Sequence, residues 1–231
     1  MAASAETIEW LARTAMFAPL SEADRRAVAE EMRETSFVAG QVIFGRRDEG
    51  REIYLVTRGR ARLSILTAEG RELSFAHAEP GTVFGEIAML DGGPRTADAT
   101  AVSKGVALTL SKAAFQRLAE SRPQMIDAAI KFLCRRLREA DQQLEAIALY
   151  PIEVRLARFF LAAARQKGPG DADRVAIDLD MSQSELALLI GASRPKVNTA
   201  LSLLEANGAV ERQDGKIVCD MEELRMIAGS D

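Results

Sequence analysis

The sequence is poor in the residues that build metal and redox centres. Its 231 residues include one histidine, His77, and two widely separated cysteines, Cys134 and Cys219. An iron–sulfur cluster needs about four cysteine ligands, and a lone histidine at a strand end is more often a surface residue than a haem ligand. Two cysteines also form no disulfide framework, which favours a reducing compartment. We therefore expect no metal, no redox cofactor and a cytoplasmic location.

Long apolar runs and a basic excess are missing as well. No apolar stretch approaches the roughly 20 residues of a membrane-spanning helix, and Glu6, Glu9 and Arg13 do not match a secretory signal. We expect no membrane association. The net charge is −4, so the overall composition does not favour nucleic-acid binding. The length is sufficient for two domains with their own cores.

The most informative segment runs from Phe84 to Ala97, where Glu86 and Arg95 bracket a short helical turn and a Gly-Gly-Pro loop. Backbone N–H groups at the start of such a turn can donate to phosphate oxygens. The Arg95 guanidinium and the Thr96 hydroxyl add further donors, and the Glu86 carboxylate can accept from sugar hydroxyls. The segment predicts a pocket for a nucleotide with one phosphate. The alternative is a surface Arg–Glu pair beside an ordinary turn.

This segment lies in a region whose apolar residues recur with a period of two. Residues 60–65 and 72–75 alternate between polar and apolar, and glycines mark turns about every ten residues between residues 35 and 111. This rhythm predicts an antiparallel barrel or sandwich. Residues 1–32 instead show helical spacing, and Ser21-x-x-Asp24 is typical of a helix start.

A long helix is predicted after Pro123. Its apolar residues are spaced alternately by four and three positions, which is the heptad pattern that packs a helix against a copy of itself. The alternative is a helix that packs only on its own barrel, but the narrow, regular face favours a homodimer. The seam consists of Ile126, Ile130, Leu133, Leu137, Ala140, Leu144 and Ile147.

Tyr150-Pro151 marks the end of this helix, because proline disfavours a continuing helix and can begin a new one. The apolar residues between Ile152 and Lys167 predict that new helix, and the Gly168–Asp171 turn ends it.

Residues 182–207 read as two short helices joined by a tight turn. Ser182-x-x-Glu185 is a capping box, Gly191 ends the first helix, and the second runs to Asn207-Gly208. Asp214-Gly215 then predicts a two-residue hairpin. A helix-turn-helix followed by a hairpin indicates a winged helix, whose second helix enters the DNA major groove. Any helical hairpin with a glycine turn would imitate the first part of this pattern.

Polar residues at the start of the second helix are candidates for DNA contact. Arginine suits the O6 and N7 atoms of guanine, whereas lysine and serine suit phosphates. Residues 151–231 carry 10 basic and 13 acidic residues, so basic charge must be concentrated on one face if DNA is the partner. The candidates are Ser193, Arg194, Lys196, Asn198 and Thr199 at this start, together with Ser182 at the start of the first helix.

The Phe84–Ala97 segment resembles the phosphate-binding cassette of cyclic-nucleotide-binding domains. In that family the arginine neutralises the cyclic phosphate and the glutamate binds the ribose 2′-hydroxyl, which implies these roles for Arg95 and Glu86. The matching positions are Phe84, Gly85, Glu86, Ile87, Ala88, Pro94, Arg95, Thr96 and Ala97.

The order of parts resembles the CRP/FNR family of bacterial transcription regulators from about residue 15 onward. The resemblance implies an α+β fold with a cyclic-nucleotide-binding β-roll with N-terminal helices (residues 1–122), a dimerisation helix (123–149) and a winged helix-turn-helix domain (150–231). It also implies double-stranded DNA, a second copy of the chain and RNA polymerase as partners. The loop at residues 167–174 is a candidate polymerase contact.

The recognition-helix motif of this family falls on Gly191–Val197, which places its base-reading arginine at Arg194. Two positions differ from the catabolite activator. Pro195 stands where that protein has a glutamate, and Thr199 stands where it has a second base-reading arginine. We therefore expect an operator that shares only part of the familiar half-site.

The base-binding position differs too. Ala140-Asp141 aligns with the Thr-Ser pair that contacts adenine in the catabolite activator. Asp141 can accept from the adenine amino group or from two adjacent donors of guanine, and the alternative is a solvated charge beside the seam. Cyclic AMP is the first expectation and cyclic GMP its rival. The full candidate ligand set is Phe84, Gly85, Glu86, Ile87, Ala88, Arg95, Thr96, Ala97, Ala140 and Asp141.

Together these features predict a transcription regulator whose operator binding is controlled by a cyclic nucleotide, with no catalytic residues and no enzyme activity. A ligand-independent regulator of the same family is one alternative. A nucleotide-binding regulatory subunit that acts on a protein partner is another.

Overall fold

The computed structural model describes residues 4–66, 72–165, 173–179, 183–213 and 215–229. They belong to two compact units, residues 1–137 and 138–231, and each unit has a hydrophobic core of its own. Every helix in the described ranges is too short or too polar to cross a membrane. The predicted three-part division of the chain stays a prediction.

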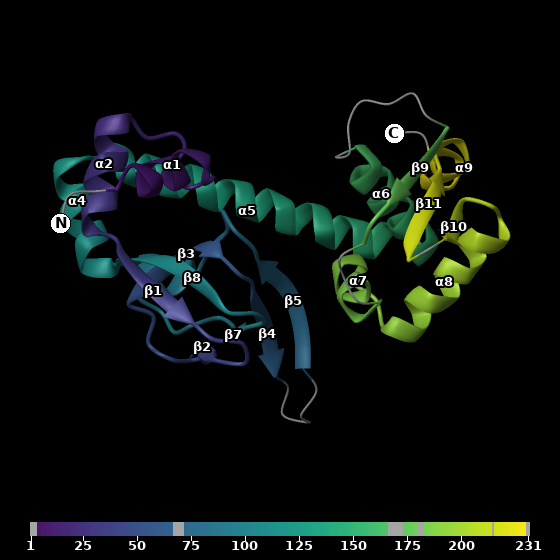
Figure 1. The fold of residues 1–231 in the computed structure, drawn as a ribbon, viewed down its shortest axis with the longest axis horizontal. Helices are drawn as coiled ribbons and strands as arrows, with labels where there is room; N and C mark the ends of the chain where they lie inside the picture. Colours follow the sequence, from purple (N-terminus) through teal and green to yellow (C-terminus); the bar gives the residue numbers. More distant parts are fainter. Residues whose placement is uncertain (1–3, 67–71, 166–172, 180–182, 214, 230–231) are drawn as a thin grey trace. The chain divides into compact units, whose positions relative to one another are not determined.

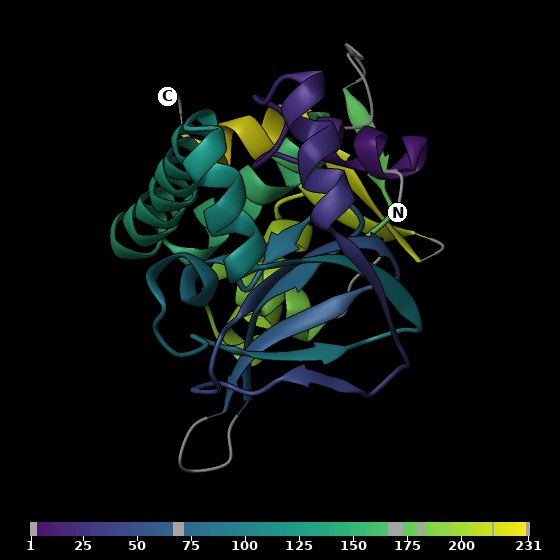
Figure 2. The same cartoon turned by 90° about the vertical axis from the view of Figure 1, so that its left-hand side faces the viewer.

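Two antiparallel sheets form the body of the first unit (Figures 1 and 2). One has the order β1-β8-β3-β6 and the other β2-β7-β4-β5. Alternate side chains such as Val56 and Leu63 are buried between them. The strands are β1 (Arg33–Phe37), β2 (Val42–Phe44), β3 (Glu52–Arg58), β4 (Ala61–Leu66), β5 (Glu72–Ala78), β6 (Val83–Phe84), β7 (Asp98–Ala101) and β8 (Gly105–Ser111).

Helices α1 (Ala5–Arg13), α2 (Glu22–Glu31) and α4 (Lys112–Ser121) bury their apolar residues together with the start of α5 (Gln124–Leu149), and in Figure 2 α2 and α4 lie above the strands. The predicted start of α2 is confirmed, since the Ser21 hydroxyl accepts a hydrogen bond from the Asp24 N–H at 3.2 Å. Sequence analysis did not predict α4.

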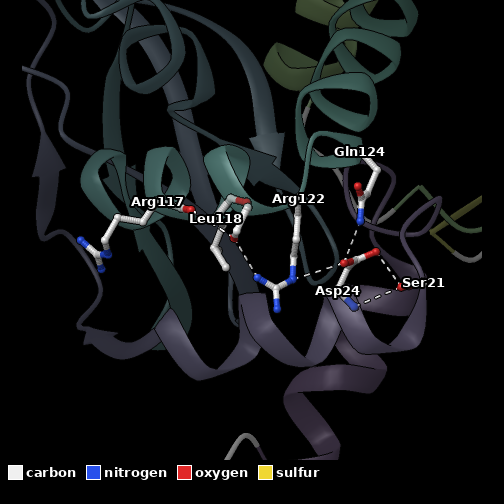
Figure 3. A network of polar contacts seen from close by, with 7 residues as sticks. Ser21, Asp24, Arg117, Leu118, Arg122 and Gln124 are labelled. Atoms are coloured by element: carbon white, nitrogen blue, oxygen red, sulfur yellow. Dashed lines mark hydrogen bonds and ion pairs between the residues drawn. The ribbon is translucent and has the colours of Figure 1, made fainter.

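A buried carboxylate ties α2 to the beginning of α5 (Figure 3). Asp24 is 7% exposed and accepts hydrogen bonds from the Ser21 hydroxyl at 2.6 Å and the Gln124 amide at 3.0 Å. The Arg122 guanidinium lies 3.3 Å from the same carboxylate. These hydrogen bonds, more than the nearby cation, hold the pKa of Asp24 below its usual value. The first turn of α5 is therefore attached to α2.

Helix α5 has two apolar faces with different surroundings. Met125, Ala128, Ala129 and Phe132 are buried in the core of the first unit, which the four-then-three spacing of the seam did not reveal. The large seam residues are mostly exposed: Ile126, Ile130, Leu137, Leu144 and Ile147 are 45–66% exposed. Leu133 is partly buried against the core, and Ala140 is exposed.

In the second unit, α6 (Ile152–Arg165) begins just after Tyr150-Pro151, at the predicted break. The predicted end of this helix, up to Asp171, lies outside the described residues. The unit continues with β9 (Arg174–Ile177), α7 (Gln183–Ile190), α8 (Arg194–Ala206), β10 (Val210–Gln213), β11 (Lys216–Asp220) and α9 (Met221–Ala228).

Strands β10 and β11 pair antiparallel, with β9 on the far side of β11. The predicted hairpin is therefore present, although Asp214 at its turn lies outside the described residues. Sequence analysis missed β9 and α9. The expected α+β class, with a β-roll, a long helix and a winged helix-turn-helix, is confirmed.

Candidate functional site

Arg95 lies at the centre of the first candidate site. It follows the short helix α3 (Glu86–Asp91), and its side chain is almost fully buried, at 4% exposure. Its Nη1 atom donates to the carbonyl oxygens of Glu52 and Gly85, both at 2.8 Å. Its Cζ atom lies 4.1 Å from the centroid of the Phe44 ring, a cation–π contact. Carbonyl oxygens and an aromatic face thus hold the guanidinium in one position.

Two glycines allow the backbone to approach this guanidinium. Gly85 has φ +79°, and a Cβ there would lie 2.5 Å from Arg95 Nη1. At Gly50 a Cβ would lie 2.2 Å from the Cβ of Ala88. A side chain at either position would displace the elements that enclose the pocket.

The loop before β3 fixes the Arg95 backbone. The Arg47 N–H donates to the Arg95 carbonyl at 2.9 Å, and the Arg95 N–H donates to the Asp48 carbonyl at 2.8 Å. Sequence analysis did not identify this loop as a support.

The Arg95 charge is only partly compensated. No carboxylate of the described residues forms an ion pair with it, and its buried Nε has no hydrogen-bond partner among them. Burial lowers the pKa of the guanidinium, and the neighbouring Tyr54, Glu52, Asp48 and Glu86 act in the opposite direction. Arginine stays protonated at neutral pH even so. A buried cation without an ion-pair partner favours an anionic ligand.

Glu86 provides an acceptor next to this cation. It is 4% exposed and forms no hydrogen bond to another described residue, so both of its oxygens can accept. Its Oε1 lies 3.8 Å from Nη2 of Arg136, on α5. Arg136 is a pocket residue that sequence analysis did not identify, because nothing in the helical spacing distinguishes it from the neighbouring exposed arginines.

The pocket has a volume of about 90 Å³, smaller than the roughly 300–1,000 Å³ typical of small-molecule sites. The structure brings together the eight predicted ligand residues from Phe84 to Ala97 and adds Phe44, Leu63 and Arg136. Ala140 and Asp141 are exposed and belong to the other unit, so their contact with a ligand stays a prediction. The described residues contain no group of three or more His, Cys, Asp or Glu that could hold a metal ion.

The second candidate site is the outer face of α8. The predicted inner face is confirmed, since Val197, Ala200, Leu201 and Leu204 are buried. Their burial leaves the candidates Ser193, Arg194, Lys196 and Thr199 exposed. The Ser193 hydroxyl makes no capping bond to the helix and remains available for a phosphate. Asn198 is only half-exposed, and its Oδ1 atom is buried without a partner among the described residues. Ser182 lies outside the described residues.

The turn between α7 and α8 is tightly held. Arg155 Nη1 donates to the carbonyl oxygens of Ile190 at 2.5 Å and Gly191 at 3.3 Å, which satisfies the end of α7. Gly191 has φ +67°, and a Cβ there would lie 2.5 Å from Ile147 Cδ1. The last turn of α5 therefore packs directly on the turn that precedes α8.

The chain segments that contain the two candidate sites match known domain families. Residues 34–122 match the family model described as a cyclic nucleotide-binding domain, and residues 154–227 match the Crp-like helix-turn-helix domain. The chain is 34% identical over 178 residues to the cyclic AMP receptor protein of Thermus thermophilus, covering 77% of this chain and 79% of the relative. The chain belongs to the CRP/FNR family of transcription regulators.

Two further comparisons extend over nearly the whole chain. The CRP-like cAMP-activated global transcriptional regulator of Mycobacterium tuberculosis is 28% identical over 218 residues, covering 94% of this chain and 97% of the relative. The crystal structure of the Thermus thermophilus catabolite activator protein is 30% identical, with a TM-score of 0.55, and covers 93% of this chain and 98% of that one. As a CRP/FNR protein, the chain is a DNA-binding regulator with a cyclic-nucleotide-binding domain, and it is not an enzyme.

Proposed function

We propose that this protein is a homodimeric transcription regulator whose operator affinity is controlled by a cyclic nucleotide, with cyclic AMP the first candidate and cyclic GMP the second. The observation that carries the proposal is the buried Arg95 guanidinium, which has no ion-pair partner among the described residues. One phosphate anion in this pocket would compensate the charge and give bidentate acceptors to the guanidinium.

The other polar groups of the pocket favour a ribose phosphate over a bare anion. The Glu86 carboxylate lines the same pocket as Arg95, and a sugar hydroxyl would donate to it. Thr96 offers a further hydroxyl for the phosphate or the base. Asp141 is the residue expected to distinguish the two bases. Its carboxylate could accept from the amino group of adenine or from two adjacent donors of guanine.

The exposed seam of α5 supports a second copy of the chain as partner. Large apolar side chains such as Leu137 and Leu144, 62% and 66% exposed, repeat at heptad spacing on a face that the core of the first unit does not cover. An apolar heptad face of this kind is stabilised by pairing with its own copy. In such a dimer two α8 helices about 34 Å apart would meet successive major grooves.

Calorimetry of the full chain with cyclic AMP, cyclic GMP and inorganic phosphate tests the ligand assignment. We expect one site per chain for a cyclic nucleotide and no measurable binding of inorganic phosphate. If neither cyclic nucleotide binds but an operator duplex is still retarded, the protein is a ligand-independent regulator.

The Arg194→Ala variant separates a DNA regulator from a nucleotide-binding subunit that acts on a protein. In a DNA regulator the variant loses operator affinity and keeps its nucleotide affinity.

Contact with RNA polymerase and a cytoplasmic location are further parts of the proposal. Residues 167–172, which make up most of the loop proposed for the polymerase contact, lie outside the described residues.

A further inference from the structure

The outer face of α8 carries a chemical pattern that sets which bases it can read. Arg194 and Lys196 provide cationic donors, and neither is paired with another described residue. Between Arg194 and Leu203 the helix contains no aspartate or glutamate. Carboxylates are the side chains that accept from the N4 amino group of cytosine. The exposed first two turns of α8 therefore offer no charged acceptor for cytosine.

The nearest carboxylate on this helix is already engaged. Glu205 lies one turn further along, is half-buried, and forms an ion pair with Arg212 of β10 at 2.8 Å. Its carboxylate is therefore already paired within the domain.

The Thr199 hydroxyl is also engaged, and this limits what the exposed side chain can offer to a base. Its Oγ1 donates to the Pro195 carbonyl oxygen, one turn earlier, at 3.1 Å. Threonine in helices adopts this bond to the preceding turn readily. This bond uses the single hydroxyl proton, so the side chain can no longer donate to a base and offers its methyl group and the lone pairs of Oγ1.

Pro195 extends this apolar surface. It is exposed and lies four residues before Thr199, so the two side chains are neighbours on one face of the helix. The pyrrolidine ring has no polar atom outside the backbone. We refer to the ring and the Thr199 methyl group as the apolar ridge, and Arg194 directly precedes it in the sequence.

We infer that this ridge reads the C5-methyl groups of thymines, in the same half-site whose guanine is read by Arg194. In the major groove the thymine methyl is the apolar feature that distinguishes base pairs, and a threonine methyl is one of the groups that contact it. The inference rests on the proposed DNA-binding function and specifies the DNA sequence that is bound. Its half-sites have a guanine facing Arg194 and thymine at the positions facing Pro195 and Thr199.

The test begins with selection of binding sites from random duplexes by the full-length protein, with cyclic AMP, with cyclic GMP and without nucleotide. Each thymine of the selected half-site is then replaced by deoxyuridine, which removes only the methyl group. We expect replacement of a contacted thymine in one half-site to weaken Kd by about four-fold, the effect of exposing one methyl group.

Two variants of one exposed residue identify the side chain responsible. Thr199→Val keeps a methyl at the same place and should retain the preference for thymine over deoxyuridine. Thr199→Ser keeps the hydroxyl but lacks the methyl, and should bind the two duplexes with nearly equal Kd at the position that Thr199 contacts.

The outcomes separate this inference from the proposed function. Cytosine at these positions in the selected sites, or a Kd unchanged by every deoxyuridine replacement, would overturn the thymine assignment while leaving the DNA regulator intact. If no duplex is enriched with or without nucleotide, both the inference and the proposed function are wrong.

Discussion

The two units differ most in where their candidate functional residues lie. In the first unit Glu86 and Arg95 are each only 4% exposed, whereas in the second Arg194, Lys196 and Thr199 are exposed. The difference follows from the partner. A small anion gains most from charges in a dry pocket, whereas a duplex can only be approached by side chains that extend from the surface.

This contrast has an energetic consequence. Arg95 is held by carbonyl oxygens and the Phe44 ring, so the pocket keeps its shape before ligand arrives. On α8 the Arg194 and Lys196 side chains form no hydrogen bond or ion pair with another described residue, and the Thr199 hydroxyl is bonded only to the Pro195 carbonyl. Substitutions in the pocket should therefore alter both ligand binding and packing, and those on α8 should alter DNA binding alone.

The largest effect is expected from Arg95→Gln. Glutamine lacks the charge and the bidentate fork, so affinity for the cyclic nucleotide should fall by about 100-fold or more. Arg51→Gln is the matched control, because Arg51 is an exposed arginine of the same unit, paired with Glu49 at 2.8 Å. Calorimetry should show unchanged affinity for the control, and equal losses in both variants would contradict the assignment of Arg95.

Arg194→Ala comes next and tests the exposed side of the comparison. Loss of a bidentate contact to guanine should weaken operator binding by about 5–150-fold, with thermal stability and nucleotide affinity unchanged. Arg225→Ala on α9 removes another exposed arginine of this unit and should have a much smaller effect in a gel-shift titration. A variant of Arg194 that loses stability would show that this residue is structural.

Asp24→Asn should produce a smaller effect, confined to stability. Removing charge from a carboxylate that accepts from Ser21 and Gln124 should lower the free energy of unfolding by about 1–3 kcal/mol at pH 7. The native pKa of Asp24 is lowered, so its contribution is complete above the unfolded value of about 3.9 and is lost as pH falls through the native pKa. Denaturation curves should show the free energies of unfolding of the natural chain and the variant converging below pH 4. A difference that stays constant with pH would contradict a role for the Asp24 charge.

The smallest effects come from a pair of glycines, one in each unit. Gly85 and Gly208 have similar positive φ angles, +79° and +74°, so alanine at either should cost about 1–2 kcal/mol of stability. Only at Gly85 would the new Cβ meet a functional atom, Arg95 Nη1, since nothing lies within 4 Å at Gly208. Nucleotide affinity should fall in Gly85→Ala and stay constant in Gly208→Ala, and the comparison between buried and exposed sites fails if both variants bind alike.

Local patterns in the sequence predicted much of this molecule. The Ser21 cap, the inner face of α8 and the break at Tyr150-Pro151 all depend on residues close in the chain, and the structure shows each of them. The pocket residues between Phe84 and Ala97 were predicted for the same reason, because one continuous segment carries them.

Long-range pairings could not be predicted in this way. Arg136 reaches the pocket from α5, fifty residues after Glu86, and Phe44 reaches it from β2. The second apolar face of α5, which includes Met125 and Phe132, was hidden by the regular heptad spacing of the first. Helix α4 begins with a serine cap, since the Ser111 hydroxyl accepts from the Ala114 N–H, but sequence analysis did not predict this helix.

The most direct test of the account is operator affinity measured in a gel-shift titration with and without cyclic AMP or cyclic GMP, for the natural chain and for Arg95→Gln. Couplings between sites are typically about 1–3 kcal/mol, so we expect one nucleotide to change the operator Kd of the natural chain by about 5–150-fold. The Arg95→Gln protein should show no such change at the same nucleotide concentration. An operator Kd that is the same in every condition for both proteins would contradict control of DNA binding by a ligand in the Arg95 pocket.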